Sequence, residues 1–536
     1  MIVAGGGREA SAAYDGPVLM PAHAQMARDR LVRPMPAGDG LWGWGGPLVI
    51  ALFAGILRFW HLGTPKAFIF DETYYAKDAY ALLKFGVEQS FVKSEDGKTD
   101  IANERILDGN LTDLFVGTPS YVVHPPGGKW AIASGEWIFG MTPFGWRFAV
   151  ALAGTLSVLM IARIGRRLFR STLLGCTAGL VLAVDGLHFV HSRTALLDPL
   201  LMFWVLAAFG ALLIDRDRAR ALLADRIGDR DRFGPGLGLR PWRIAAGVFL
   251  GLACSTKWSG LWFVVAFAVM TVLWDLGARR TAGVRRPYAG TLVRDFGPAF
   301  ASLIFVAITV YLATWTGWFL GGEHAYLRDW AKDNPGPALV PDALWSLLHY
   351  HSDALNFHRG LESFHPYRSN PWGWMLLARP VSYFYESPTN GSKGCDVEQC
   401  SQAVTALGTP VIWWAGTVAV LVVAYLWLGR RDWRAGAVLA GLAGGYLPWF
   451  FFQGRTIYSF YAVAFAPWVV LAVTMCLGLV LGGSGASPHR RRWGAVAAGA
   501  FVLLAIANFA YLLPVLSAEV IPRAEWSKRM WWTSWI

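Results

Sequence analysis

Apolar runs of roughly 20 residues recur along the chain and alternate with short Arg-rich segments, and a helix needs about that length to cross a bilayer. The pattern predicts eleven membrane-spanning helices, at about residues 41–62, 146–164, 173–190, 194–214, 244–256, 258–276, 296–319, 410–428, 435–452, 456–481 and 493–516. We therefore expect an all-α polytopic membrane protein.

Two long segments lack a run that could cross a membrane: 63–145 and 321–408. The apolar piece that ends near Phe139 is short and carries Lys129 and Glu136. If it crossed, the following Arg cluster at 163–170 would change sides, so we expect an interfacial helix on the outer leaflet.

The flanks of the chain differ from its centre. Residues 1–40 are rich in Gly, Ala and Pro without an apolar period, which predicts a disordered cytoplasmic tail. We expect one transmembrane domain over 41–518, followed by an extracytoplasmic C-terminal tail over 519–536.

Charge orients the predicted spans. With the N-terminus inside, eleven spans place every Arg cluster on the cytoplasmic face, as the positive-inside rule requires. These clusters lie at 28–33, 163–170, 279–286, 430–434 and 489–492. Both long segments then lie outside, which predicts a plasma-membrane protein whose active site is extracytoplasmic.

Composition agrees with a membrane protein. The chain is 55% hydrophobic and only 16% charged, and its 28 Trp residues suit interfacial belts. The Arg clusters account for the net charge of +12 without a nucleic-acid partner. No His/Cys group has zinc-ligand spacing, so we expect no metal dependence and no cofactor, with membrane lipids as the surroundings.

Asp71 and Glu72 directly follow the first span, among aromatic residues. A solvated loop would account for such a pair, but ionisable groups at a membrane boundary are also kept when they are paired or used. Lone cations stand at the predicted outer ends of other spans: Arg147, Arg193, Lys257 and Arg455. Each could be an interface anchor whose stem reaches water, or together they could bind a membrane-borne phosphate.

Other polar residues have supporting roles in this interpretation. Asp198 lies about one helical turn from Arg193, which predicts an ion pair that positions the Arg. His124, like His349 and His351, could be an acid or a ligand, and metal binding is the weaker alternative. A carboxylate opposite a phosphate pocket indicates group transfer from a lipid phosphate to a hydroxyl, with Asp71 as general base.

A set of motifs extends this interpretation from Phe70 to Tyr461. Together they resemble, in family order, the bacterial protein O-mannosyltransferases of the GT-C glycosyltransferase group. The motifs are Phe70–Glu72, His124–Lys129, Trp146–Arg147, Ser192–Arg193 with Leu196–Asp198, Lys257–Leu261, Ser369–Trp372, Arg379–Tyr383, and Gly454–Thr456 with Tyr461.

The resemblance implies a role for each matching residue. Asp71 is the expected base, and Glu72 is expected to bind acceptor or position the loop. Contacts to the lipid phosphate or donor are expected from Arg147, Arg193, Lys257, Arg455 and Tyr461. Supporting positions are His124, Lys129 and Asp198.

The resemblance also implies substrates. The donor would be polyprenyl-phosphate-mannose, and the acceptors would be Ser/Thr hydroxyls of proteins emerging from the secretion machinery. The second outer loop is too short for the trefoil-like domain of eukaryotic members, which fits the bacterial branch. Inversion is expected because Glu72, adjacent to Asp71, points elsewhere and cannot serve as a covalent nucleophile.

Two alternatives remain at this stage. Another GT-C transferase would act on a lipid or glycan acceptor, but would lack the block Arg379–Tyr383. A transporter would show mid-span polar residues and repeat symmetry between its halves, and the sequence has neither.

Cys395 and Cys400 are predicted to form a disulfide in the second outer loop. Two thiols in a Gly/Ser-rich segment are the alternative. An extracytoplasmic location favours the bridge.

Overall fold

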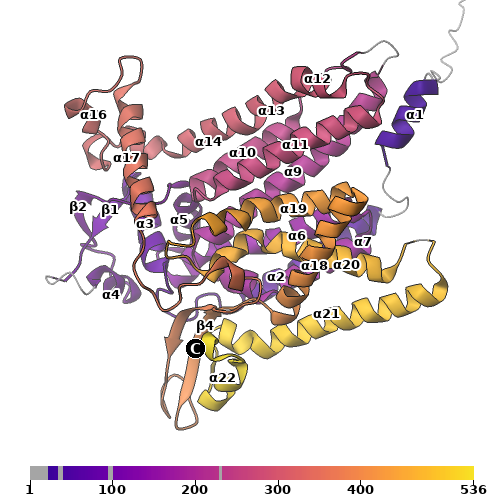
Figure 1. Cartoon of the computed structure of the whole chain (residues 1–536). Helices are drawn as coiled ribbons and strands as arrows, with labels where there is room; N and C mark the ends of the chain where they lie inside the picture. The colour runs from indigo at the N-terminus through magenta and orange to yellow at the C-terminus, as the bar shows by residue number, and fades with distance from the viewer. Residues whose placement is uncertain (1–21, 34–39, 95–99, 228–231, 484) are drawn as a thin grey trace, which may run out of the picture.

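The computed structural model describes residues 22–33, 40–94, 100–227, 232–483 and 485–536. Long helices run side by side in one bundle (Figure 1). Its helices are α2 (Gly40–Phe59), α6 (Pro143–Phe169), α7 (Thr172–Ala183), α8 (Gly186–His191), α9 (Leu197–Arg226), α10 (Pro241–Thr256), α11 (Gly260–Thr281), α12 (Pro287–Thr291), α13 (Gly297–Phe300), α14 (Val306–Thr314), α15 (Thr316–Leu320), α18 (Pro410–Arg430), α19 (Trp433–Gly445), α20 (Ala466–Leu481) and α21 (Pro488–Leu516).

Among the described residues, eight helices are long and apolar enough to cross a membrane. They are Gly40–Phe59, Pro143–Phe169, Leu197–Arg226, Gly260–Thr281, Pro287–Thr314, Pro410–Arg430, Ser459–Leu481 and Pro488–Leu516. The three other expected spans coincide with shorter helices, namely α7 with α8, α10 and α19. The polytopic helical architecture is thus confirmed, whereas the count of eleven stays a prediction.

Several expected spans are not single regular helices. The span expected at 173–190 breaks at Val184 and Asp185, where Asp185 caps α8 by accepting from the His188 N–H at 3.0 Å. Helix α19 ends at Gly445, before Pro448, and continues as the 3₁₀ turn η5 (Leu447–Phe451). A second 3₁₀ segment, η6 (Ser459–Phe465), precedes α20.

The helix that runs from α12 to α14 also departs from regular geometry. It contains two π-helical turns, η1 (Leu292–Phe296) and η2 (Ala301–Phe305). Its first residue, Pro287, lies nine positions before the span expected from hydropathy at 296–319. The helix therefore extends further toward the Arg279–Arg286 cluster than the apolar pattern indicates.

Both long insertions lie at one end of the bundle (Figure 1). The first contains α3 (Glu72–Phe85), β1 (Gln89–Phe91), α4 (Ile101–Leu107), β2 (Phe115–Pro119) and α5 (Gly127–Phe139). The second contains η3 (Gly322–His324), α16 (Trp330–Asp333), α17 (Asp342–Arg359), η4 (Pro371–Gly373), β3 (Val381–Glu386) and β4 (Cys400–Ala406). Helix α5 exposes Trp137, Ile138 and Phe139, which suits the interfacial position expected for it.

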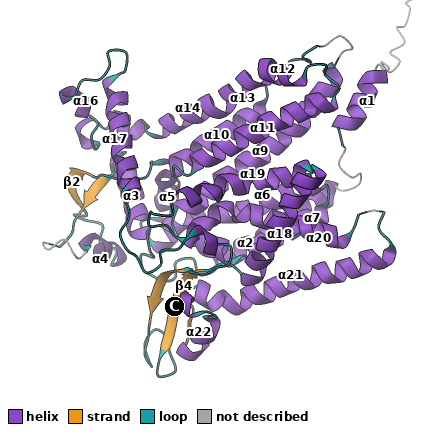
Figure 2. Cartoon of the chain, viewed as in Figure 1, coloured by secondary structure: helices purple, strands orange, loops and turns teal. Residues whose placement is uncertain are grey.

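The strands occur at the same end of the bundle (Figure 2). Strands β1 and β2 pair antiparallel, and a three-stranded antiparallel sheet has the order β3-β4-β5, with β5 at Val520–Pro522. Helix α22 (Arg523–Arg529) and the turn η7 (Thr533–Trp535) follow β5. The segment 519–536 is thus joined to the second insertion through a sheet that the apolar pattern did not predict.

The expected disordered tail is wrong for part of its length. Ala22–Leu31 form helix α1, whose residue Leu31 belongs to the same buried hydrophobic cluster as Leu223 of α9. Arg28 pairs with Asp225, and Arg220 donates to the Leu31 carbonyl. The remainder of the expected tail, 1–21 and 34–39, lies outside the described residues.

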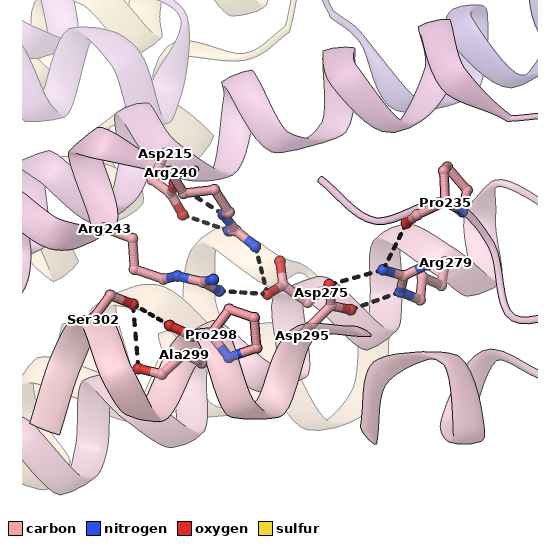
Figure 3. A network of polar contacts seen from close by, with 10 residues as sticks. All are labelled: Asp215, Pro235, Arg240, Arg243, Asp275, Arg279, Asp295, Pro298, Ala299 and Ser302. Carbon is pink, nitrogen blue, oxygen red and sulfur yellow. Dashed lines mark hydrogen bonds and ion pairs between the residues drawn. The ribbon is translucent and has the colours of Figure 1, made fainter. Parts of the chain in front are cut away.

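A buried ionic network joins α9, α10 and α11 at the end of the bundle where α1 lies (Figure 3). Arg240 donates to Asp215 of α9 and to Asp275 of α11, and Arg243 donates to Asp275. Arg279 contacts Asp295 at 2.6 Å and 2.8 Å. The charged side chains of this network are therefore paired with one another between neighbouring helices.

Candidate active site

Asp71 stands at the start of α3 and is half-buried. It occupies the N-cap position, yet its carboxylate makes no capping hydrogen bond to the helix. The preceding residue, Phe70, has φ of 51°, a conformation that costs energy for a bulky side chain. Its ring stacks on Tyr383 at 4.5 Å and meets Phe460 edge-on at 5.4 Å. This aromatic packing presents Asp71 with its carboxylate available for chemistry.

Glu72 points into the protein and is fully buried. It makes a two-point ion pair with Arg147, with Nε–Oε1 and Nη2–Oε2 both at 2.8 Å. It also accepts from the Ile69 and Ala195 N–H groups, each at 2.9 Å. Of the two roles expected for Glu72, the geometry supports positioning of the loop.

Arg147 is buried with Glu72 and has no donor left for a phosphate. Besides the carboxylate, its guanidinium donates to the carbonyls of Leu62, Pro65 and Ala67. Each N–H of the group therefore meets a protein acceptor. This geometry corrects the expectation that Arg147 contacts the lipid phosphate.

Arg193 is also committed to the backbone. Its Nη1 and Nη2 atoms donate to carbonyls at the C-terminal end of α2, where the last carbonyls of a helix lack partners within it. The acceptors are Leu57, Arg58, Trp60 and His61. Arg193 thus binds the C-terminal end of α2. Its contacts do not support the expectation that it binds the lipid phosphate.

Asp198 pairs with Lys257 and not with Arg193. The Lys257 Nζ lies 2.9 Å from both carboxylate oxygens of Asp198. The expected pair fails because residues 192–196 are not helical, so helical spacing does not apply between Arg193 and Asp198. The Lys257 ammonium also lies 4.5 Å from the ring centroid of Tyr461.

The electrostatic environment of Asp71 suits a base. Burial raises its pKa to about 6, and the negative charge of Asp198 acts in the same direction. The positive charge of Lys257 and a hydrogen bond with Tyr75 lower the pKa. A carboxylate with a pKa near the working pH is an effective general base.

Arg455 lies in the loop between η5 and η6. Its Nη2 lies 3.3 Å from His358 Nδ1, and its Nε is buried without an acceptor among the described residues. His124 neighbours this pair, with 5.1 Å between its ring centroid and that of His358. Burial, followed by the charge of Lys257, lowers the pKa of His124 well below its ordinary value. His124 is therefore a neutral neighbour of the site.

Comparison with known proteins identifies the family of this site. Residues 107–320 match the family model "Dolichyl-phosphate-mannose-protein mannosyltransferase", and 344–535 match "C-terminal four TMM region of protein-O-mannosyltransferase". A "Polyprenol-phosphate-mannose--protein mannosyltransferase" of Mycolicibacterium smegmatis (strain MKD8) is 41% identical over 93% of this chain and 94% of its own. The protein of that name from Mycobacterium tuberculosis (strain H37Rv) is 40% identical, over 93% and 92%.

The chain belongs to the protein O-mannosyltransferase family. The family predicted from the motifs is thereby confirmed. The fold agrees, since the S. cerevisiae protein O-mannosyltransferase Pmt1-Pmt2 complex bound to the sugar donor matches with a TM-score of 0.70. That match covers 97% of this chain and 96% of the yeast chain at 15% identity.

Lys129 of this mannosyltransferase supports the site from a distance. Its Nζ lies 2.7 Å from Glu88 and 3.2 Å from Asp78, and all three belong to the first insertion. The bridge from α5 to Asp78 on α3 fixes the helix that begins next to Asp71. Cys395, in the segment that links β3 and β4, forms the predicted disulfide with Cys400 at the start of β4.

Three residues of the mannosyltransferase site were missed by sequence reasoning. Tyr75 lies one turn after Asp71, a spacing that could have identified it. Tyr383 belongs to a family motif, but its contact with His191 Nε2 at 3.0 Å joins residues far apart in the chain. His358 follows His351 by seven residues on α17, and nothing in this spacing distinguishes it as a residue of the site.

Proposed function

We propose that this chain transfers mannose from polyprenyl-phosphate-mannose to Ser/Thr hydroxyls of proteins. Relatives at 40–41% identity carry the corresponding name over nearly their whole length. The observation that carries the proposal is Asp71, a half-buried carboxylate with a raised pKa beside Lys257. Arg455, with a buried N–H that lacks an acceptor among the described residues, supplies a phosphate-binding group.

The proposed reaction is a single displacement. The acceptor oxygen forms a bond to the anomeric carbon of mannose while the bond from that carbon to the phosphate oxygen breaks. The hydroxyl proton passes to Asp71, and polyprenyl phosphate leaves. Arg455 stabilises the negative charge of the phosphate, and so does Lys257, which lies beside the carboxylates.

Inversion follows from the carboxylates around Asp71. A retaining double displacement needs a second carboxylate as covalent nucleophile. Glu72 is bound to Arg147, and Asp198 is bound to Lys257. We therefore expect a β-linked donor to give an α-linked product.

The proposed location is the outer face of the plasma membrane. Helices α6, α9, α11 and α18 have Arg residues in their last turns. Asp198 starts α9, and Lys257 precedes α11, so the site lies at the opposite ends of these helices. The positive-inside rule then supports an extracytoplasmic site, where acceptor proteins would emerge from the secretion machinery.

Mannose transfer to a peptide tests the function. Membranes that contain the enzyme would receive polyprenyl-phosphate-[³H]mannose and either a Ser/Thr peptide or the same peptide with Ala at each hydroxyl position. We expect label only in the hydroxyl peptide and an α-linkage in the product. Label that enters lipid or glycan and not peptide would favour the alternative GT-C transferase.

The same assay tests the proposal that no metal or cofactor is required. Arg455 and Lys257 are cations that can balance the charge of a phosphate leaving group. We expect transfer to continue at its full rate after treatment with EDTA. Loss of transfer that returns with a divalent cation would contradict this part of the proposal.

A further inference from the structure

Helix α17 brings His358 to the edge of the site. The residue lies in the last turn of the helix and is half-buried. Its two ring nitrogens contact two different segments. Nε2 lies 2.9 Å from the Val123 carbonyl oxygen, and Nδ1 lies 3.3 Å from Arg455 Nη2.

The two partners define the proton arrangement of His358. A carbonyl oxygen only accepts, so Nε2 carries the hydrogen and donates to Val123. A guanidinium only donates, so Nδ1 accepts from Arg455. Burial, together with the charges of Arg455 and Lys257, lowers the pKa of His358 to about 4, and the hydrogen bond to Val123 acts in the opposite direction. The neutral imidazole is therefore the form that binds Arg455 at neutral pH.

Arg455 depends on the contact with His358 for its orientation. Its long side chain loses conformational freedom when it is fixed, and it sits in a loop between two 3₁₀ segments. Its Nε is buried and has no acceptor among the described residues. A buried donor without an acceptor is costly, which indicates that a ligand supplies the acceptor.

We propose that His358 is a positioning residue that holds the Arg455 guanidinium for the phosphate of the lipid donor. This role rests on the proposed function, because the donor phosphate is the acceptor for the remaining Arg455 donors. His358 does not touch the substrate; it acts through Arg455. Its bond to Val123, next to His124, fixes the imidazole so that Nδ1 faces the guanidinium.

Two substitutions separate the contacts of His358. In His358→Asn the side-chain oxygen can take the place of Nδ1, which keeps the acceptor for Arg455 and loses the bond to Val123. In His358→Gln the side-chain amide can take the place of Nε2, which keeps the bond to Val123 and loses the acceptor. Both variants are uncharged and similar in size to the native residue.

The experiment measures KM for polyprenyl-phosphate-mannose and for a Ser/Thr peptide separately. We expect His358→Gln to raise the donor KM by about 10-fold, since a hydrogen bond to a charged group is lost, and to leave the peptide KM unchanged. His358→Asn should keep the donor KM within about 2-fold of the native value. Thermal unfolding of both purified variants reports whether either change merely disturbs folding.

A double-mutant cycle completes the test. In an Arg455→Ala background, His358→Gln should add no further rise in donor KM, because the residue through which it acts is absent. Additive effects would overturn the proposal. So would a larger donor effect from His358→Asn than from His358→Gln, or unchanged donor KM in both variants. Failure of the native enzyme to mannosylate peptide would instead contradict the proposed function.

Discussion

Glu72 and Arg147 form a fully buried two-point ion pair directly behind Asp71. The pair joins the start of α3 to α6, and the same guanidinium binds three carbonyls of the segment between α2 and α3. Adjacent carboxylates thus have different tasks: Glu72 fixes the loop, and Asp71 faces the site.

Glu72→Gln should therefore lower stability and activity together. Removing one partner leaves the charge of Arg147 buried without its counter-ion, which typically costs about 3–5 kcal/mol. We expect a lower Tm of the purified protein and weak mannose transfer. Asp71→Asn is the matched control, and it should keep the native Tm. An unchanged Tm in Glu72→Gln would contradict the structural role.

Arg455→Ala should impair use of the donor more than use of the acceptor. Its guanidinium has a buried N–H without an acceptor among the described residues, and this N–H is available for a ligand. We expect a rise in KM for the lipid donor of at least about 10-fold and little change in KM for the peptide. Arg359→Ala, at an exposed position on α17, serves as the control. A change confined to the peptide KM would assign Arg455 to the acceptor site.

The pH dependence of transfer should report the ionisation of Asp71. The base must be deprotonated, so kcat/KM should fall as the pH drops through about 6. Asp198→Asn removes a negative neighbour that raises the pKa of Asp71, so the acid limb should move to lower pH. Asp353→Asn, in the second insertion, should leave the limb in place. A shift to higher pH in Asp198→Asn would contradict this assignment of charges.

The structure explains which parts of the site the sequence could predict. Arg147, Arg193, Lys257 and Arg455 look alike in the sequence, as single cations next to apolar runs. Their roles differ because of acceptors that tertiary contacts bring within reach, such as the Ala67 carbonyl for Arg147. For Arg193 and for much of Arg147 these acceptors are backbone carbonyls, which no pattern of side chains reveals.

In the fold, too, some elements could be predicted from the sequence and others depend on tertiary contacts. Helices such as α6 and α9 were predictable because their apolar length identifies them. The break at Asp185 was not, since this carboxylate lies in an otherwise apolar segment and binds Trp413 Nε1 at 2.7 Å in a distant helix. The sheet β3-β4-β5 depends on pairing with residues near the C-terminal end, which local periodicity does not encode.

The Cys395–Cys400 disulfide should stabilise its loop without affecting the chemistry. It closes a small ring, for which the gain in loop-closure entropy is modest. A variant with Ser at both positions should keep most of its mannose transfer and become easier to cleave between β3 and β4 by protease added outside cells. Native protein from intact cells with both thiols reduced would contradict the bridge and the outer location of the loop.

The central claim is that Asp71 accepts the proton of the acceptor hydroxyl, and Asp71→Asn tests it most directly. Asn keeps the size and polarity of the side chain but cannot act as a base. Single-turnover transfer from bound polyprenyl-phosphate-mannose to a Ser/Thr peptide should fall by roughly 10²–10⁴-fold, while donor affinity and Tm stay near native values. Near-native transfer by Asp71→Asn would contradict the account.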